Sequence, residues 1–458
     1  MARKYLSRRG FLSLAAAATG ATVLAACQPK VVEKVVKETV EVVKEKEKVV
    51  TATPVSVKKV TMEFWGLTFA EGSPDVHAIE TFNKMTPTIE VKPTQMERDK
   101  MIAAVAAGAP PDLLNTFYEP TATFASEGVI IPLDPYIEAS QVKIEQLYPP
   151  AVEMGMWNGK HYALPFWVGN ETYLLWSADD FREVGLDPNV PPKTFAELDQ
   201  FADKLTKRDA SGKITRLGFA PNWSWTHSDG YAQFFAGKGS LFDAKSNQIT
   251  CDNPEIVAAF DWEAGYFKRY GAEFIDALPS AWTPSMPFFA GVLSICLGGC
   301  WWSNLYRSGG FTGDWRVGPV PHTEKHPEFG KGARMGLAPW SIPTQAKHPD
   351  QAWQYMSWAL WDPEVALWHT PSGQMSAYVP SWDDPKARMD VHYAAMMDYL
   401  KDAYVVWFPV DLPCCVEEYR NELVTMEDKI LHLEISAAEG MKQLKDKMQP
   451  KIDAAAKK

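Results

Sequence analysis

The chain has 458 residues, with 46 Lys and Arg against 57 Asp and Glu and a formal net charge of −11. Four basic residues lie in the first 26 positions and positions 27–59 carry a net charge of +3, so the remainder carries −18. Nucleic-acid binding rests on phosphate neutralisation by lysine and arginine, and this charge balance argues against such a partner.

The first 26 residues have the pattern of an export signal. Four basic residues and no acid precede the apolar run FLSLAAAATGATVLAA at positions 11–26. A basic start, a moderately apolar run and small residues before the end are typical of a cleaved signal, and the run is too short for a lasting membrane span. SRRGFL at positions 7–12 resembles the twin-arginine export motif.

The next signal is LAAC at positions 24–27, which resembles a bacterial lipobox and implies that Cys27 is acylated. Acyl chains anchor a protein because each buried CH₂ contributes about 0.8 kcal/mol of membrane affinity. Residues 27–59 are rich in valine, lysine and glutamate. We expect a charged, solvated tether there, with a marginal amphipathic stalk as the alternative. The exported body is thus expected at the outer face of the cytoplasmic membrane.

From residue 60 the chain alternates strand and helix patterns. Strands are predicted over 60–66, 88–95 and 112–118, and helices over 74–85 and 99–108, with Ser73 as the cap of the first helix. The alternation returns at 172–205, and the chain becomes largely helical beyond 349. Strand and helix alternation predicts parallel sheet covered by helices, and a body of this length predicts two domains.

Six fragments, taken in order, resemble one known family. They are AAGAPPDLL (106–114), the crossing segment 159–198, FFAGVLSICLGGCWWSNL (288–305), DWRVGPVP (314–321), the segment 336–360 and SGQMSAYVP (372–380). In this order and spacing, nearly the whole mature chain resembles the extracellular solute-binding lipoproteins of carbohydrate importers, the relatives of maltodextrin-binding protein. The resemblance implies a two-lobed periplasmic-binding-protein-like fold of type II, in which each lobe is a mixed sheet flanked by helices.

The resemblance also implies the domain limits and the partners. Residues 60–165 and 297–341 are expected in lobe 1, and residues 166–296 and 342–458 in lobe 2. A carbohydrate would bind in the cleft between the lobes and pass to the permease of an ABC-type importer. We expect a monomer without catalytic activity, cofactor or metal.

Sugars have apolar C–H faces and polar rims, so their sites combine aromatic platforms with amide and carboxylate groups. Tryptophans and polar residues near predicted strand ends and crossings are therefore the expected ligand contacts: Trp65, Gln95, Asn115, Tyr118, Trp167, Asn170, Asn222, Trp223, Trp225, Trp301, Trp302, Trp340 and Gln374. In GGCWW (298–302) we expect one indole to pack in the core and the other to face the ligand. Tryptophans on predicted helices, at positions 353, 358, 361 and 368, are expected to pack.

Cysteine and histidine spacings predict no metal site. Cys251 stands alone, while Cys296 with Cys300 and Cys414 with Cys415 are open as local disulfides or as buried thiols. HTEKH (322–326) places two histidines four apart but lacks a third ligand.

Two other functional classes stay open. One is an anchored carbohydrate-active enzyme using two carboxylates, although no GxSxG or HExxH motif supports it. The other is the same fold with a polyamine, metal chelate or peptide as its ligand.

Overall fold

The computed structural model describes residues 59–66, 69–115, 120–170, 172–221, 228–238, 240–278, 286–302, 304, 312–336, 339–406, 412 and 414–455. The expected signal, the lipobox with Cys27, and the tether up to residue 58 lie outside this part of the chain. Residues 57–458 form one unit by their contacts. Within the ranges just given, no helix combines the length and the apolar character needed to cross a membrane.

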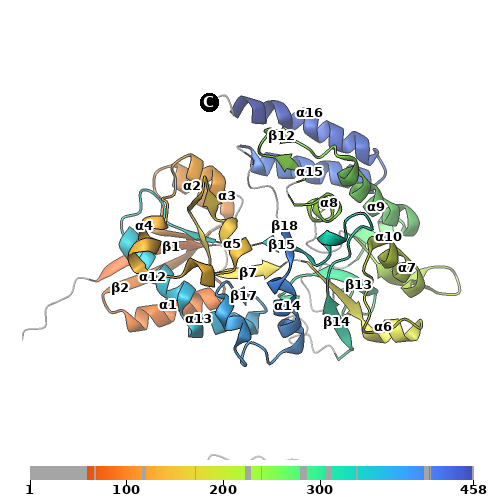
Figure 1. Ribbon diagram of the computed structural model, residues 1–458, viewed down its shortest axis with the longest axis horizontal. Coiled ribbons are helices and arrows are strands. Elements are labelled where there is room, and N and C mark those ends of the chain that lie inside the picture. Colours follow the sequence, from red (N-terminus) through yellow and green to blue (C-terminus); the bar gives the residue numbers. More distant parts are fainter. Residues whose placement is uncertain are drawn as a thin grey trace, which may run out of the picture. The chain divides into compact units, whose positions relative to one another are not determined.

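The first large sheet has the strand order β2-β1-β3-β16-β6. Its strands β1 and β2 are labelled in Figure 1. Its strands are β1 (Val60–Gly66), β2 (Ile89–Gln95), β3 (Leu113–Asn115), β16 (Pro339–Ser341) and β6 (Leu164–Pro165). β1 pairs in parallel with both β2 and β3, and β16 is antiparallel to β3 and β6. The predicted strand over 60–66 is confirmed to the residue, and this sheet forms the core of lobe 1.

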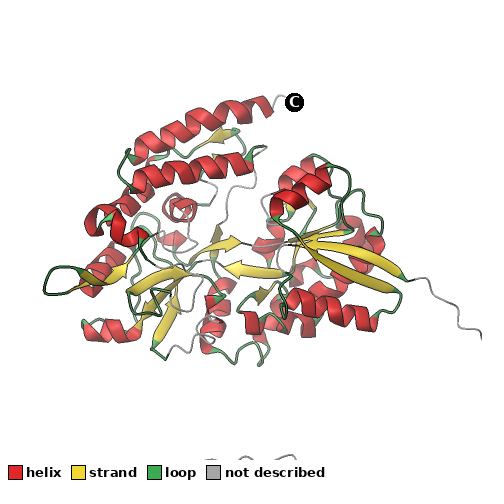
Figure 2. Ribbon diagram, turned by 180° about the vertical axis from the view of Figure 1, so that it is seen from behind, coloured by secondary structure: helices red, strands yellow, loops and turns green. Residues whose placement is uncertain are grey.

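Helices cover both faces of this sheet (Figure 2). On one face, Phe64 contacts Tyr355 of α12 (Pro349–Trp361) and lies in one cluster with α1 (Pro74–Met85). On the other, Leu114 packs in a second cluster with α2 (Arg98–Ala106) and α3 (Pro120–Ser126). Ser73 caps α1 as predicted, since its Oγ accepts the Val76 N–H at 3.3 Å.

The second large sheet has the order β14-β8-β13-β10-β9. Its strands are β8 (Tyr173–Ser177), β9 (Lys207–Arg208), β10 (Ile214–Phe219), β13 (Leu293–Gly298) and β14 (Trp315–Gly318). β10 and β13 are parallel, whereas β8 is antiparallel to β13 and β14. The helices of this lobe are α6 (Ala178–Glu183), α7 (Phe195–Leu205), α8 (Ser228–Ala236), α9 (Pro254–Tyr270), α10 (Ala272–Asp276), α15 (Val416–Leu431) and α16 (Ala437–Ala455).

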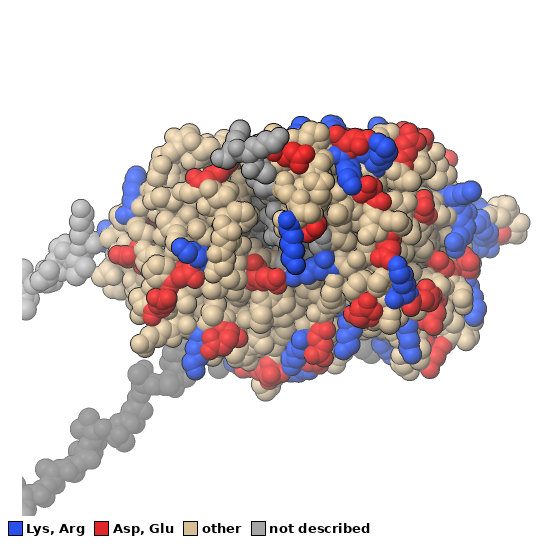
Figure 3. All heavy atoms as spheres, turned by 45° about the horizontal axis from the view of Figure 1, so that its top comes forward, with Lys and Arg blue, Asp and Glu red and all other residues tan. Residues whose placement is uncertain are grey.

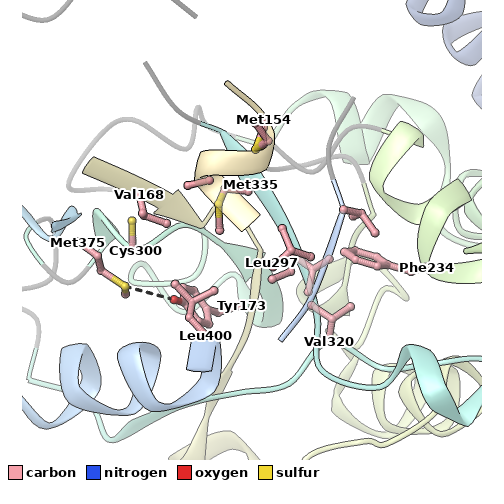
Figure 4. Packing of buried hydrophobic residues seen from close by; sticks show 14 of the residues in the cluster. Met154, Val168, Tyr173, Phe234, Leu297, Cys300, Val320, Met335, Met375 and Leu400 are labelled. Carbon is pink, nitrogen blue, oxygen red and sulfur yellow. Dashed lines mark hydrogen bonds between the residues drawn. The ribbon is translucent and has the colours of Figure 1, made fainter. Parts of the chain in front are cut away.

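A third sheet, with the order β17-β7-β15-β18, lies where the chain crosses between the two large sheets. Its strands are β7 (Trp167–Asn170), β15 (Gly332–Gly336), β17 (Met375–Ser376) and β18 (Tyr404–Val406). β7 connects β6 of the first sheet to β8 of the second, and β15 precedes β16 of the first. The crossing is packed with apolar side chains, among them Val168, Met335, Met375 and Leu297 (Figure 4). Two α/β lobes are thus joined by a buried crossing sheet.

The remaining elements are short or lie at the edges of the lobes. They are α4 (Asp134–Ser140), η1 (Ile144–Gln146), α5 (Pro149–Glu153), β4 (Met156–Trp157), β5 (Lys160–His161), β11 (Phe242–Asp243), β12 (Gln248–Ile249), η2 (Pro327–Phe329), α13 (Pro363–Leu367), η3 (Thr370–Ser372), η4 (Val379–Asp383) and α14 (Val391–Lys401).

Sheet membership corrects two of the expected lobe limits. Residues 297–341 were expected in lobe 1, but β14 pairs with β8 of lobe 2, with Trp315 opposite Ser177. Residues 342–458 were expected in lobe 2, but α12 packs on lobe 1, where the Tyr355 ring stacks on Trp340 with centroids 5.3 Å apart. The chain changes lobes more often than expected, and no local pattern in the sequence marks where it crosses.

Candidate functional site

The carboxyl ends of the parallel strands define one edge in each lobe. In lobe 1, β1 and β3 end together, with Gly66 opposite Asn115. In lobe 2, β10 and β13 are in parallel register, with Phe219 opposite Ile295. Ligands of open α/β sheets bind beyond the carboxyl ends of the strands. The candidate site is therefore built from the residues at these two edges.

The GGCWW segment stands at the edge of lobe 2, where β13 ends at Gly298. A Cβ atom on Gly298 would lie 2.4 Å from the Trp302 ring, and one on Gly299 would lie 2.2 Å from the Trp301 ring. Each glycine therefore makes room for one indole. Trp302 is fully buried, whereas Trp301 is half-buried. The two indoles therefore differ in burial, since Trp302 belongs to the core and Trp301 packs at its margin.

Trp340 packs in the core of lobe 1, and its expected role as a ligand contact is wrong. Its ring is stacked on Phe166 with centroids 4.3 Å apart and on Tyr355 with centroids 5.3 Å apart. It is completely buried, and Phe64 meets it edge-on at 5.0 Å. Aromatic rings thus surround this indole and leave no face for a sugar.

Two further tryptophans of the expected set, Trp167 and Trp65, differ in burial. Trp167, on β7, is 8% exposed and lies against Gly169, where a Cβ atom would come within 2.7 Å of the indole. Trp65, on β1, is half-buried and packs against the cluster under α2 and α3. Trp223 and Trp225 lie outside the described residues.

The expected polar contacts have different environments. Gln95 is exposed at the end of β2. Asn115 is fully buried at the end of β3, and its Nδ2 donates to Asp75 Oδ1 at 3.3 Å. Gln374 is half-buried in the turn before β17, and its carbonyl accepts from the Tyr393 hydroxyl at 2.5 Å. Asn170 is the last residue of β7. Tyr118 and Asn222 are outside the described part of the chain.

Three buried polar groups near Trp340 were not singled out from the sequence. Burial raises the pKa of Asp75, in the first turn of α1, to about 7. Burial lowers the pKa of His369 to about 3, and its ring lies edge-on to Phe166 at 4.6 Å. Neither His369 ring nitrogen nor the Tyr355 hydroxyl has a hydrogen-bond partner among the described residues. No sequence motif marks these groups, because burial alone makes them unusual.

A buried ion pair joins the crossing sheet to lobe 2. Arg334 Nε on β15 lies 3.0 Å from Asp229 Oδ2 on α8, and both side chains are almost completely buried. The Thr172 hydroxyl also accepts the Arg334 backbone N–H at 2.6 Å. α8 begins directly after residues 222–227, which contain the expected tryptophan pair. The ion pair therefore fixes the first turn of the helix that follows this segment.

Asp112 and His326, which could suggest catalysis or metal binding, have structural partners. Asp112 accepts the backbone N–H groups of Glu63, Lys347 and His348 at 2.8–3.0 Å. His326 contacts the carboxylates of Glu255 and Glu328. No group of three metal-ligating side chains occurs within the described ranges. Acidic and basic side chains are interspersed over the face in Figure 3.

The comparisons with known proteins agree with this architecture. Residues 77–395 match the family model of the bacterial extracellular solute-binding protein. The maltotriose-binding protein of Pyrococcus abyssi is 26% identical over 289 residues, 62% of this chain and 59% of that protein. The sn-glycerol-3-phosphate-binding periplasmic protein UgpB of Escherichia coli K12 is 29% identical over 213 residues, 43% of this chain and 47% of that protein.

The solved structure of CpMnBP1 with mannobiose bound is similar to this one with a TM-score of 0.73 and 26% identity, and the match covers 85% of this chain and 99% of that one. The chain spans about half to three-fifths of the length of these two curated relatives. The family model, by contrast, covers more than two thirds of this chain. The protein is a member of the bacterial extracellular solute-binding protein family.

Proposed function

We propose that the protein captures a sugar or polyol between its two lobes and delivers it to an ABC-type importer. The observation that carries this proposal is the half-buried Trp301, seated on Gly299 beyond the carboxyl end of β13. An indole held in place by backbone contact loses little conformational freedom when a sugar ring stacks on it. Relatives named for maltotriose and mannobiose favour a small oligosaccharide.

A phosphate ester is the alternative that the UgpB relatives raise. Phosphate recognition uses bidentate arginine, lysine or helix N-termini. Residues 60–458 carry a net charge of −18, and Arg334, the arginine most fully buried in the described ranges, is already paired with Asp229. The charge distribution therefore favours a neutral ligand over an anionic one.

The experiment is calorimetric titration of the purified chain with mannobiose, maltotriose, glucose, sn-glycerol 3-phosphate and spermidine. Binding of at least one saccharide with a Kd at or below about 10 μM, roughly −7 kcal/mol, is the expected result. Binding of the phosphate ester or the polyamine, with none of the saccharides, would contradict the proposal.

The binding step is proposed to close the two lobes on the ligand. A ligand that contacts both lobes only in the closed state shifts the population toward that state. The crossing strands β7, β15, β17 and β18 are the connections about which the lobes would turn. Small-angle scattering of the chain with and without a saccharide that binds should show a smaller radius of gyration at saturation. Equal radii would contradict closure.

Export and anchoring complete the proposal. The basic, apolar and small-residue order of positions 1–26 and the lipobox-like LAAC support transport across the membrane and acylation of Cys27. The solvated tether would then hold the lobes near the permease while leaving them free to turn.

A further inference from the structure

Two neighbouring cysteines directly before α15 bring their sulfur atoms unusually close together. Cys415 Sγ lies 2.7 Å from Cys414 Sγ, with the Cys415 thiol as donor. Non-bonded carbon atoms in good contact are about 3.5–4.0 Å apart, and sulfur is larger than carbon. A disulfide bond, by comparison, is about 2.05 Å long. The two sulfur atoms are therefore already inside non-bonded contact distance.

The backbone and the neighbouring helices hold this arrangement. Cys415 is the N-cap residue of α15 and has φ 61° and ψ 26°, a left-handed conformation that is uncommon for residues other than glycine. Cys414 Sγ contacts the Lys451 carbonyl oxygen of α16 at 3.7 Å. The pair is thus positioned by the packing of two helices of lobe 2.

The pair also differs from the other described cysteines in its access to solvent. Cys251, Cys296 and Cys300 are buried, whereas Cys414 and Cys415 are both partly exposed. A small oxidant dissolved in water can reach partly exposed thiols, and burial protects the other three.

We propose that Cys414 and Cys415 form a reversible vicinal disulfide, so that this pair is a redox modification site of the protein. This disulfide proposal rests on the proposed function only for the protein's location outside the cytoplasm. Disulfides persist in the oxidising compartments to which the export signal would send the chain. The oxidant is a low-molecular-weight disulfide.

Thiol–disulfide exchange gives the balance of atoms and electrons. The Cys415 thiolate attacks one sulfur of the oxidant, and the other sulfur leaves as a thiol. Cys414 then loses its proton and attacks the Cys415 sulfur of the mixed disulfide, which releases the second thiol. Two protons and two electrons pass from the cysteine pair to the oxidant, and one S–S bond replaces another.

The order of attack follows from the surroundings of the two thiols. Burial raises the pKa of Cys414 to about 12, which disfavours its thiolate. Cys415 is therefore the attacking residue, and Cys414 resolves the mixed disulfide.

The experiment treats the folded full chain with oxidised glutathione, unfolds it without reductant and alkylates every remaining thiol. Trypsin then releases residues 402–420, which contain both cysteines and end at Arg420. The expected peptide is unalkylated and two hydrogens lighter than its reduced form, while Cys251, Cys296 and Cys300 are alkylated. Reductant before alkylation should restore two alkylated cysteines in 402–420.

Single-cysteine variants serve as matched controls. In Cys414→Ser, Cys415 has no resolving partner, so the peptide should carry one glutathione. In Cys415→Ser, the remaining thiol should react much more slowly. Alkylation of both cysteines after oxidation, two glutathiones on one peptide or a covalent dimer through this pair would each overturn the proposal. The mass readout does not depend on sugar binding, so failure here is distinguishable from failure of the proposed function.

Discussion

The ring of Trp302 lies against the α-carbon of Gly298, so closely that a Cβ atom on Gly298 would come within 2.4 Å of it. Gly299 has the same relationship to Trp301, at 2.2 Å. The two glycines and the two tryptophans in GGCWW therefore pack as two matched pairs. Each indole occupies the space that a Cβ atom on its glycine would need.

Gly298→Ala should destabilise the protein by about 1–3 kcal/mol, because the added methyl group overpacks a buried indole. Chemical unfolding of the variant measures this loss. Gly265→Ala is the matched control, since Gly265 lies within α9 and a Cβ atom there meets nothing within 4 Å. That control should leave stability unchanged or raise it by up to about 1 kcal/mol, as alanine favours helix more than glycine does. Equal stability of the two variants would contradict the packing account.

His369 should make the protein sensitive to acid. Its folded pKa of about 3 lies below the ordinary 6.5, so between these values the unfolded chain binds a proton that the folded chain does not. Stability should therefore fall as pH falls through this window, by about 1.4 kcal/mol per unit at most. Urea unfolding of the wild type and of His369→Leu at pH 7.5 and pH 5 tests this. The variant should lose less stability on acidification, and an identical loss in both proteins would contradict the prediction.

Asp75 should make the stability of the protein depend on pH in the direction opposite to that of His369. Its folded pKa of about 7 lies above the ordinary 3.8, so the unfolded chain releases its proton first as pH rises. Stability should fall between pH 3.8 and pH 7, by roughly 4 kcal/mol in total if the full shift is realised. Asp75→Asn removes this titration and can still hydrogen-bond Asn115. Unfolding curves at pH 8 should show the variant to be more stable than the wild type, and a less stable variant would refute the assignment.

Cys27→Ser should release the protein from the membrane without unfolding it, because only the expected acylation site is changed. Fractionation of cells that express the variant, followed by circular dichroism of the released chain, measures both effects. Retention of the variant in the membrane fraction would show that another feature holds the protein there.

The local elements could be predicted from the sequence because short-range rules decide them. Ser73 with Pro74 marks the start of α1, and Thr194 caps α7 by accepting the Glu197 N–H. The order of strands and helices then indicates the fold class. These features depend on residues within one helical turn of each other, and their succession predicts an α/β body. The two lobes were expected from the length of that body and from the family resemblance.

The lobe limits and the role of Trp340 could not be predicted, because both depend on contacts between distant segments. Trp340 stacks on Phe166 and on Tyr355, and the three rings come from three separate stretches of the chain. The sequence alone does not reveal whether another aromatic ring or water covers a given tryptophan side chain. Likewise, β14 belongs to lobe 2 only because it pairs with β8, about 140 residues earlier in the chain.

The most direct test of the central claim compares saccharide affinity and stability in Trp301→Ala and Trp302→Ala. If the half-buried indole is a sugar platform, Trp301→Ala should bind the saccharide at least about tenfold more weakly, a loss of roughly 1.4 kcal/mol, at near-normal melting temperature. Trp302→Ala should instead lose about 3–5 kcal/mol of stability, as buried aromatic truncations do. Wild-type saccharide affinity in Trp301→Ala would contradict the claim that this edge of β13 binds the sugar.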